Sequence, residues 1–283
     1  LELHKRYHGV LETLAHVPVR DTFIYKKVYS QPDASRPCEI IRDHPAEVYD
    51  LTLKNNVVAV VTDGSAVLGL GNIGPAAGLP VMEGKAVLFK TFGGVEAFPI
   101  CLRTQEVDEI VRAVEKIAPV FGGINLEDIA APECFVIEQA LRERMNIPVM
   151  HDDQHGTAII AAAGLINACH LTGRKLADIK MVVNGAGASA LACTALIKAM
   201  GARHENVIVC DRKGPIYPGR EGVDQWKSAH AVETEARTLE EALQGADVFL
   251  GLSAAGALKP GMVAGMAKEP IIFAMANPDP EIT

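Results

Sequence analysis

Apolar residues recur along the chain in short blocks, and their spacing predicts alternating strands and helices. The run VVAVVT at 57–62 is continuous and β-branched, which is typical of a strand buried on both faces. Segments 105–118 and 133–145 have the apolar spacing of amphipathic helices, and between them 120–125 predicts a short strand. Because strands and helices alternate, the pattern indicates a parallel α/β fold.

The N-terminal part of the chain is less regular. Apolar residues at helical spacing over 2–16 predict a helix that Pro18 ends. The uncharged stretch from Gly64 to Met82 holds five Gly and two Pro, so it predicts loop and turns. It therefore does not qualify as a membrane span, which needs about 20 apolar residues.

The second half of the chain has the pattern of a doubly wound, Rossmann-like dinucleotide-binding domain. Residues 180–202 predict a strand, a tight glycine turn and a helix. Further expected elements are the strands 147–150, 206–211, 248–253 and 270–277 and the helices 156–172 and 238–245. We place the boundary near residue 154, in a loop before the apolar helix, which gives an N-terminal α/β domain at 1–154 and a dinucleotide domain at 155–283.

Composition narrows the class of protein. A length of 283 residues fits about two domains. The formal charge of −8, from 27 basic and 35 acidic residues, would repel a nucleic-acid phosphate backbone, so a nucleic-acid partner is not expected. The charged opening LELHKRYHGV excludes the apolar core of a signal peptide, and six scattered cysteines without a CxxC favour reduced thiols. We therefore expect a cytoplasmic protein with no membrane partner.

A GxGxxG pattern occurs at Gly69, Gly71 and Gly74. Such a pattern indicates dinucleotide binding only where it joins a strand to a helix. Here Pro75 and Gly78 follow at once, where a helix should open. We interpret this first pattern as a decoy that does not mark a dinucleotide-binding turn.

A second pattern, GxGxxA at Gly185, Gly187 and Ala190, has the expected context. A strand at 181–184 enters it, a helix leaves it, and the acid Asp211 ends the next strand 21 residues after position 190 (211 − 190). Gly185 would permit the tight turn, Gly187 would let the backbone approach a pyrophosphate, and Ala190 would let the helix pack closely. The alternative is an ordinary turn of small residues.

The choice between NAD and NADP stays open at the sequence level. Ala188 completes the candidate turn, and Asp211 could accept hydrogen bonds from the ribose hydroxyls. The charge of Asp211 repels a 2′-phosphate and so favours NAD. Arg212 and Lys213 follow immediately, however, and could bind that phosphate.

Two pairs of acids follow two neighbouring predicted strands. Glu127 and Asp128 come after the strand at 120–125, and Asp152 and Asp153 come after 147–150. Carboxyl ends of parallel strands meet at one edge, and carboxylates without cysteine suit Mg²⁺ or Mn²⁺. The alternative is that these acids only cap helix N-termini.

A pair of histidines offers a possible zinc site. His151 and His155 are four residues apart, but the glutamate of a zinc-binding HExxH helix is missing, so zinc is disfavoured.

Lys85 lies in EGKAVLFK beside apolar residues, where burial near a cation would lower its pKa and let it act as a base. Without further information it would be interpreted as a solvated helix lysine.

Taken together, six motifs resemble the malic enzymes of the compact bacterial type. They are TDGSAVLGLGNIG, VMEGKAVLFK, FGGINLEDIAAPECF, HDDQHGTAI, VVNGAGA and FAMANPDPEI, in this order from residue 62 to residue 282. The resemblance as a whole runs from about residue 29 to the end. It implies oxidative decarboxylation of L-malate to pyruvate and CO₂ with NAD or NADP and a divalent metal, in a homodimer or larger homo-oligomer.

The resemblance also implies roles for individual residues. Glu127, Asp128 and Asp153 match the metal carboxylates of the family, and Lys85 matches its general base, with Asp152 beside that lysine. In this chemistry the metal lowers the pKa of the malate hydroxyl, the lysine removes the proton, and a hydride leaves C2 for the nicotinamide.

Two further residues carry over, and the chain departs from the family near one of them. Tyr29 matches the tyrosine that protonates the enol, and Asn277 matches a substrate-contacting asparagine. Tyr29 is followed by SQPDASRPC in place of the usual Pro-Gly-Val-Ala loop. We still expect Tyr29 to face Lys85, on a loop that moves without ligand. Since the family continues beyond Thr283, the dinucleotide domain is expected to lack its C-terminal part.

Two alternatives to this function stay open. One is a decarboxylase that converts malate directly to lactate while holding NAD. The other is a catalytically silent dinucleotide-binding or assembly module, which the altered tyrosine loop would suit. Release of pyruvate separates the first from a malic enzyme, and binding of cofactor without malate-dependent reduction would favour the second.

Overall fold

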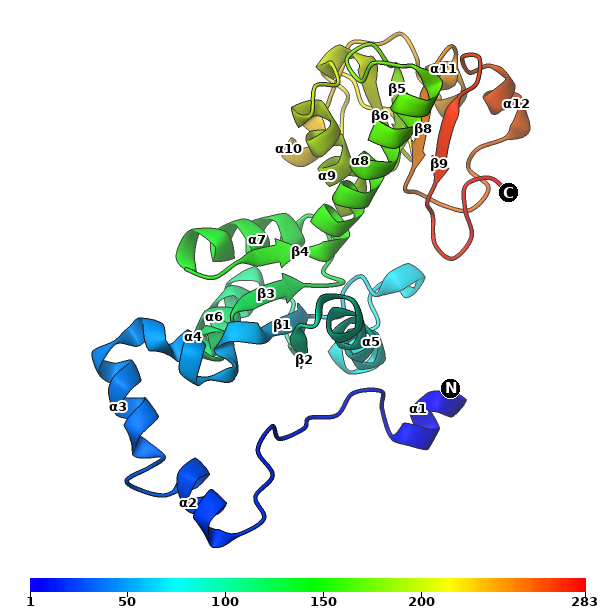
Figure 1. Cartoon of the computed structure of the whole chain (residues 1–283). Coiled ribbons are helices and arrows are strands. Elements are labelled where there is room, and N and C mark those ends of the chain that lie inside the picture. The colour runs from blue at the N-terminus through cyan, green and yellow to red at the C-terminus, as the bar shows by residue number, and fades with distance from the viewer. The chain divides into compact units, whose positions relative to one another are not determined.

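The computed structural model describes residues 1–283, which divide into two compact units (Figure 1). The first unit comprises residues 1–67, 72–129 and 136–150, and the second comprises 68–71, 130–135 and 151–283. The chain forms two sheets, one of four strands and one of five, with helices between the strands. The expected α/β class is therefore confirmed.

The first sheet has the strand order β2-β1-β3-β4. Its strands are β1 (Val57–Thr62), β2 (Glu96–Cys101), β3 (Gly123–Leu126) and β4 (Val149–His151). The β-branched strand β1 has the predicted bounds and pairs in parallel with β2 and β3. The sequence did not predict β2, because Pro99 interrupts its pattern; a proline is tolerated there since β2 lies at the edge of the sheet. β3 starts later than expected because 118–120 form a short 3₁₀ turn.

The helices of this region are α5 (Pro75–Gly93), α6 (Val107–Ile117) and α7 (Glu133–Arg144). The expectation of loop and turns up to Met82 is wrong from Pro75 onward. Proline is favoured at the first position of a helix, where its missing N–H has no intrahelical partner. Met82 and Ala86 of α5 are buried in a small core with Val60 of β1. A helix thus opens directly after Gly74, so the reason given against the first glycine pattern is also wrong.

The N-terminal segment carries short helices that bury no residue. They are α1 (Glu2–Tyr7), α2 (Thr22–Tyr29) and α3 (Ser35–Asp43), followed by the short α4 (Val48–Leu51). The predicted helix over 2–16 ends at His8, which has a φ of 54°, and Gly9 follows with a φ of 113°. Because two successive left-handed residues cannot continue an α-helix, the apolar spacing beyond Gly9 has no helix to support it.

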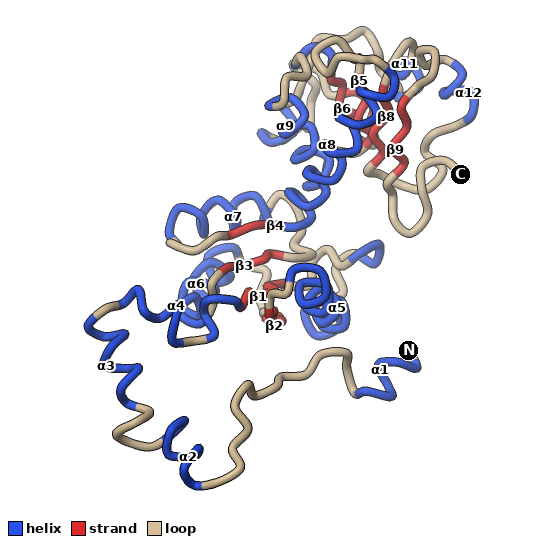
Figure 2. Tube along the Cα trace, in the orientation of Figure 1, coloured by secondary structure: helices blue, strands red, loops and turns tan.

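The second sheet has the strand order β7-β6-β5-β8-β9 and contains the strands drawn in red in the upper part of Figure 2. Its strands are β5 (Met181–Asn184), β6 (Val207–Asp211), β7 (Gly214–Pro215), β8 (Val248–Gly251) and β9 (Ile271–Ala274). Strand β5 pairs in parallel with both β6 and β8, so the chain reverses its direction of winding at β5. Such a switch point is where open α/β sheets bind ligands. The Rossmann-like expectation is confirmed.

The helices of the second unit are α8 (Asp152–Thr172), α9 (Ala188–Ala199), α10 (Gln225–Ser228), α11 (Leu239–Leu243) and α12 (Pro260–Ala264). Helix α8 starts earlier than predicted because His151 caps it: the Nδ1 of His151 accepts the Gln154 N–H at 3.3 Å. Residue 154 therefore lies in the first turn of a helix rather than in a loop. None of the helices has both the length and the apolar character that crossing a membrane requires.

Candidate functional site

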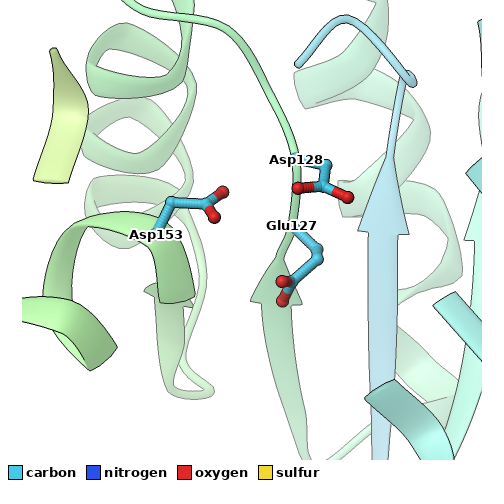
Figure 3. A group of neighbouring side chains, drawn as sticks. All are labelled: Glu127, Asp128 and Asp153. Atoms are coloured by element: carbon cyan, nitrogen blue, oxygen red, sulfur yellow. The ribbon is translucent and has the colours of Figure 1, made fainter. Parts of the chain in front are cut away.

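Three carboxylates converge at the carboxyl ends of β3 and β4, which are neighbours in the first sheet (Figure 3). Glu127 and Asp128 follow β3, and Asp153 lies in the first turn of α8, directly after β4. One oxygen from each residue lies within 4.8 Å of the others. A set made only of carboxylate oxygens fits Mg²⁺ or Mn²⁺, and a cation would relieve the repulsion among three acids of which two are buried.

The backbone after β3 holds the two buried acids in place. The Glu127 N–H donates to the Val61 carbonyl at 2.9 Å, and the Asp128 carbonyl accepts the Ala66 N–H at 3.0 Å. Asp128 has a φ of 53°, in the left-handed region that costs a non-glycine residue roughly 1–2 kcal/mol. Such strain persists where the surrounding structure fixes a functional side chain.

Both carboxylate oxygens of Glu127 have partners. Lys85 Nζ, from α5, lies 3.0 Å from Oε1, and Asn125 Nδ2 donates to Oε2 at 2.8 Å. The Lys85 side chain is only 22% exposed, so the interpretation as a solvated helix lysine is wrong. Sequence reasoning missed Asn125, although its spacing of two residues from Glu127 along a strand places both on one face.

The N-terminus of α8 contributes a buried histidine and two acids. His151 is fully buried, and its Nε2 lies 3.7 Å from Asp153 Oδ2. Asp152 is half-buried, and a Cβ at Gly156 would come within 2.4 Å of its Oδ1. His151 is the N-cap residue, and Asp152 and Asp153 lie in the first turn, where their negative charge suits the N-terminal end of the helix. The position of Asp152 beside Lys85 stays a prediction.

Two candidate residues are exposed in this single chain. Tyr29 ends helix α2 with 78% of its surface exposed, and its ring contacts Tyr25 with centroids 6.2 Å apart. The structure does not bury Tyr29 against Lys85, so the expected approach of these residues stays a prediction. Asn277 is exposed in the turn after β9.

The second glycine pattern forms a tight turn between β5 and α9. Gly185 has a φ of 130°, its N–H donates to the Cys210 carbonyl at 2.8 Å, and a Cβ there would lie 2.3 Å from the Leu252 carbonyl oxygen. Gly187 caps α9, and a Cβ on it would meet nothing within 4 Å. Ala188 begins the helix, and Ala190 is fully buried. The turn thus excludes side chains on its inner side and leaves space in front of the helix N-terminus.

A cavity of about 850 Å³ lies at this turn. Gly185, Gly187, Asp211, Arg212 and Lys213 line it, as do four residues that sequence reasoning did not single out: Lys227, Arg237, Thr238 and Ser253. The cavity and the open helix N-terminus fit a dinucleotide, whose pyrophosphate such a terminus binds. Burial opposes ionisation of Asp211, but hydrogen bonds from Arg220 and the Lys213 N–H outweigh it, so the pKa of Asp211 lies below its ordinary value.

Comparison with known proteins gives matches over both halves of the chain. Residues 24–142 match the family profile described as malic enzyme, N-terminal domain, and residues 154–282 match malic enzyme, NAD binding domain. The chain is 63% identical over 276 residues to an NADP-dependent malic enzyme of Rhizobium meliloti, covering 97% of this chain and 36% of that protein. It is 54% identical over 287 residues to a bifunctional malic/malolactic enzyme of Bacillus subtilis, covering 100% of this chain and 69% of that protein.

A solved structure agrees with these matches. The NAD-dependent malic enzyme of Thermotoga maritima superposes with a TM-score of 0.94 at 44% identity, covering 100% of this chain and 76% of that one. The chain therefore spans about a third of the Rhizobium relative and a larger share of the other two.

Proposed function

Because the chain belongs to the malic enzyme family, we propose that it catalyses oxidative decarboxylation of L-malate to pyruvate and CO₂ with NAD or NADP and Mg²⁺ or Mn²⁺. The observation that carries this proposal is the cluster of Glu127, Asp128 and Asp153, with oxygens within 4.8 Å of one another, together with Lys85 at 3.0 Å from Glu127. This arrangement supports a general base next to the residues that would hold the metal.

Each residue of the cluster has a proposed task. Glu127, Asp128 and Asp153 would hold the divalent ion, which when bound acts as a Lewis acid toward oxygens of malate. Lys85 takes the hydroxyl proton of malate, a step that typically contributes about 10²–10⁴-fold in rate. Asp152 is proposed to stand beside Lys85 and orient it. Asn125, which donates to Glu127 at 2.8 Å, keeps that carboxylate in position.

Tyr29 and Asn277 complete the proposed substrate machinery. Tyr29 delivers the proton to the enol carbon after CO₂ has left, and Asn277 contacts the substrate. The exposed position of Tyr29 supports a homo-oligomer, a dimer or larger, in which the aromatic residues of the N-terminal segment are covered. Phe23 and Tyr25 of the same helix are also exposed, at 66% and 46%.

The proposed tasks are divided between two domains. We propose a substrate and dimerisation domain at 1–154 and a dinucleotide domain at 155–283, where Gly185, Gly187, Ala188, Ala190, Asp211, Arg212 and Lys213 form the cofactor site. All six cysteines are free thiols and four of them are buried, which supports a reducing compartment and hence the cytoplasm.

Conversion of malate to lactate is a second candidate function. It is favoured by the similarity to the Bacillus subtilis protein, whose name includes a malolactic activity and of which this chain covers 69%. The same carboxylates and base would serve both reactions, so the product distinguishes them.

The test is malate-dependent reduction of NADP and NAD, side by side, with Mn²⁺ and the released acid identified. We expect reduced cofactor and pyruvate in equal amounts, both abolished by a chelator. Lactate without net reduction would favour the second function. Binding of cofactor without any turnover of malate would contradict both and indicate a silent binding module.

A further inference from the structure

The carboxylate of Asp211 at the end of β6 is already engaged by an arginine. Arg220 Nη1 donates to Oδ1 at 3.0 Å and Nη2 donates to Oδ2, so the pair is bidentate. The Lys213 N–H donates to Oδ1 at 2.8 Å. An ionised carboxylate offers about four acceptor positions, so three of them are taken within the protein.

Arg220 is fixed by the fold rather than by Asp211 alone. Its side chain is 8% exposed, and Nη1 also donates to the carbonyls of Gly214 and Pro215 at 2.9 and 3.0 Å. These two residues form β7, which pairs antiparallel with the end of β6. The guanidinium therefore links the two strands of the β6–β7 hairpin and fixes the Asp211 carboxylate at the end of β6.

An acid at this strand end ordinarily accepts hydrogen bonds from the ribose hydroxyls and repels a 2′-phosphate. Here the guanidinium neutralises the charge that would cause the repulsion, and together with the Lys213 N–H it occupies three of the roughly four acceptor positions. The sequence rule that an acid at this position favours NAD therefore does not apply to Asp211 in this environment.

All other charged residues that line the cavity are basic. Arg212, Lys213, Lys227 and Arg237 line the cavity, and Asp211 is its only acidic lining residue. Lys227 is paired with Asp224 at 2.9 Å, and Arg237 stacks on the Tyr217 ring at 4.1 Å from its centroid. Arg212 and Lys213 are exposed and follow directly on Asp211.

We infer that Arg220 is a positioning residue that sets the cofactor preference: by holding Asp211 it makes the chain prefer NADP, whose 2′-phosphate Arg212 and Lys213 bind. This inference rests on the proposed function only in taking a nicotinamide dinucleotide as the ligand of the cavity. Arg220 itself does not touch the cofactor.

Adenosine fragments test the inference without catalysis. The dissociation constants of 2′,5′-ADP and 5′-AMP are measured by calorimetry on the full chain, without malate or metal. We expect the wild-type protein to bind 2′,5′-ADP at least about tenfold more tightly, as charge-assisted contacts to the extra phosphate would give. Arg220→Met exposes the charge of Asp211 and should reduce that ratio by about tenfold, and the double variant Asp211→Asn with Arg220→Met should restore most of it.

Arg174→Met is the matched control, because Arg174 is also a partly buried arginine paired with an acid, Asp247 at 3.2 Å, but does not line the cavity. It should leave the ratio unchanged. If Arg220→Met does not fold, Asp211→Asn alone serves: the ratio should rise further toward 2′,5′-ADP.

The outcomes separate this inference from the proposed function. Equal loss of both fragments in Arg220→Met, an unchanged ratio in Asp211→Asn, or tighter binding of 5′-AMP by the wild-type protein would overturn the role of Arg220. Binding of neither fragment would contradict the dinucleotide site as well. Failure to oxidise malate with a normal fragment ratio would contradict only the proposed reaction.

Discussion

Two segments of this chain carry the same spacing of small residues, yet the connections in which they lie differ in length and conformation. Between β1 and α5 the pattern at 69–74 lies within a long connection, residues 63–74. Between β5 and α9 the pattern begins in a connection of three residues, 185–187. Both connections lead from a strand into a helix. The number of residues between strand and helix, rather than the glycines themselves, distinguishes a dinucleotide turn from a loop.

The glycine at which a Cβ would clash with backbone atoms also lies in a different place in each segment. In the long connection it is Gly64, outside the pattern: a Cβ there would lie 2.2 Å from the carbonyl carbon of Gly74, and its own carbonyl accepts the N–H groups of Ile73 and Gly74. That loop therefore closes on itself. In the short turn it is Gly185, and the next glycine, Gly187, faces open space.

The helices that follow these two connections are proposed to serve different sites. Replacement of Lys85 tests this difference with the largest expected effect. We propose that helix α5 contributes the side chain of Lys85 to the metal site, whereas α9 contributes its N-terminus to the cofactor site. Lys85→Ala should lower turnover of malate by about 10²–10⁴-fold, because the proposed proton acceptor is lost. Binding of NADP, measured by fluorescence titration, should stay within about twofold of the wild-type protein, since no contact of α5 with the nucleotide is proposed. Near-normal turnover would require another base.

Gly185→Ala should destabilise the second unit by about 3 kcal/mol or more, because the new Cβ meets a backbone carbonyl and the φ of 130° is strained for alanine. Denaturant unfolding followed by circular dichroism measures the change, and NADP binding should be lost with it. A variant as stable as the wild-type protein would contradict this prediction, because the turn would then have shifted to make room for the Cβ.

Gly64→Ala should cost about 2 kcal/mol or more through its clash with Gly74, while NADP binding persists. Gly71→Ala is the matched control: it has the same φ of 72° but a Cβ there meets nothing within 4 Å, so only the strain of roughly 1–2 kcal/mol remains. If Gly64→Ala abolished NADP binding in a protein that stays folded, the first glycine pattern would share in the cofactor site and the contrast between the segments would fail.

Gly187→Ala should have the smallest effect on stability, at most about 1 kcal/mol, because its φ of −90° suits any residue and its Cβ direction is open, so only the poorer N-cap preference of alanine remains. Binding of NADP should weaken by about tenfold, since the methyl group occupies space where the backbone approaches the pyrophosphate. An unchanged dissociation constant would place the pyrophosphate away from Gly187.

The buried strands could be predicted from the sequence because their signal is local. Strand β1 and the β5–α9 turn follow from continuous β-branched residues and from glycine spacing. Helix α5 could not be predicted in this way, because proline and glycine mark loops on average, and only the burial of Met82 and Ala86 against the sheet outweighs them.

The site shows the same limit. Two pairs of acids could be proposed as a metal site because they follow two predicted neighbouring strands, and the resemblance to the family selected Glu127, Asp128 and Asp153 among them. The partner of Asp211 could not, because Arg220 reaches it only through the hairpin of β6 with β7, a strand of two residues that leaves no periodic pattern. Contacts that depend on such a short hairpin cannot be predicted from the sequence and become visible only in the structure.

Titration with Mn²⁺ tests the central claim most directly. Glu127, Asp128 and Asp153 are proposed to hold one divalent ion, so the wild-type protein should bind one Mn²⁺, and Asp153→Asn should weaken that binding by at least about tenfold. Asp178→Asn, which changes an exposed acid paired with Arg203 at 3.5 Å, is the matched control and should leave binding unchanged. Equal Mn²⁺ affinity in the wild-type protein and Asp153→Asn would contradict the account.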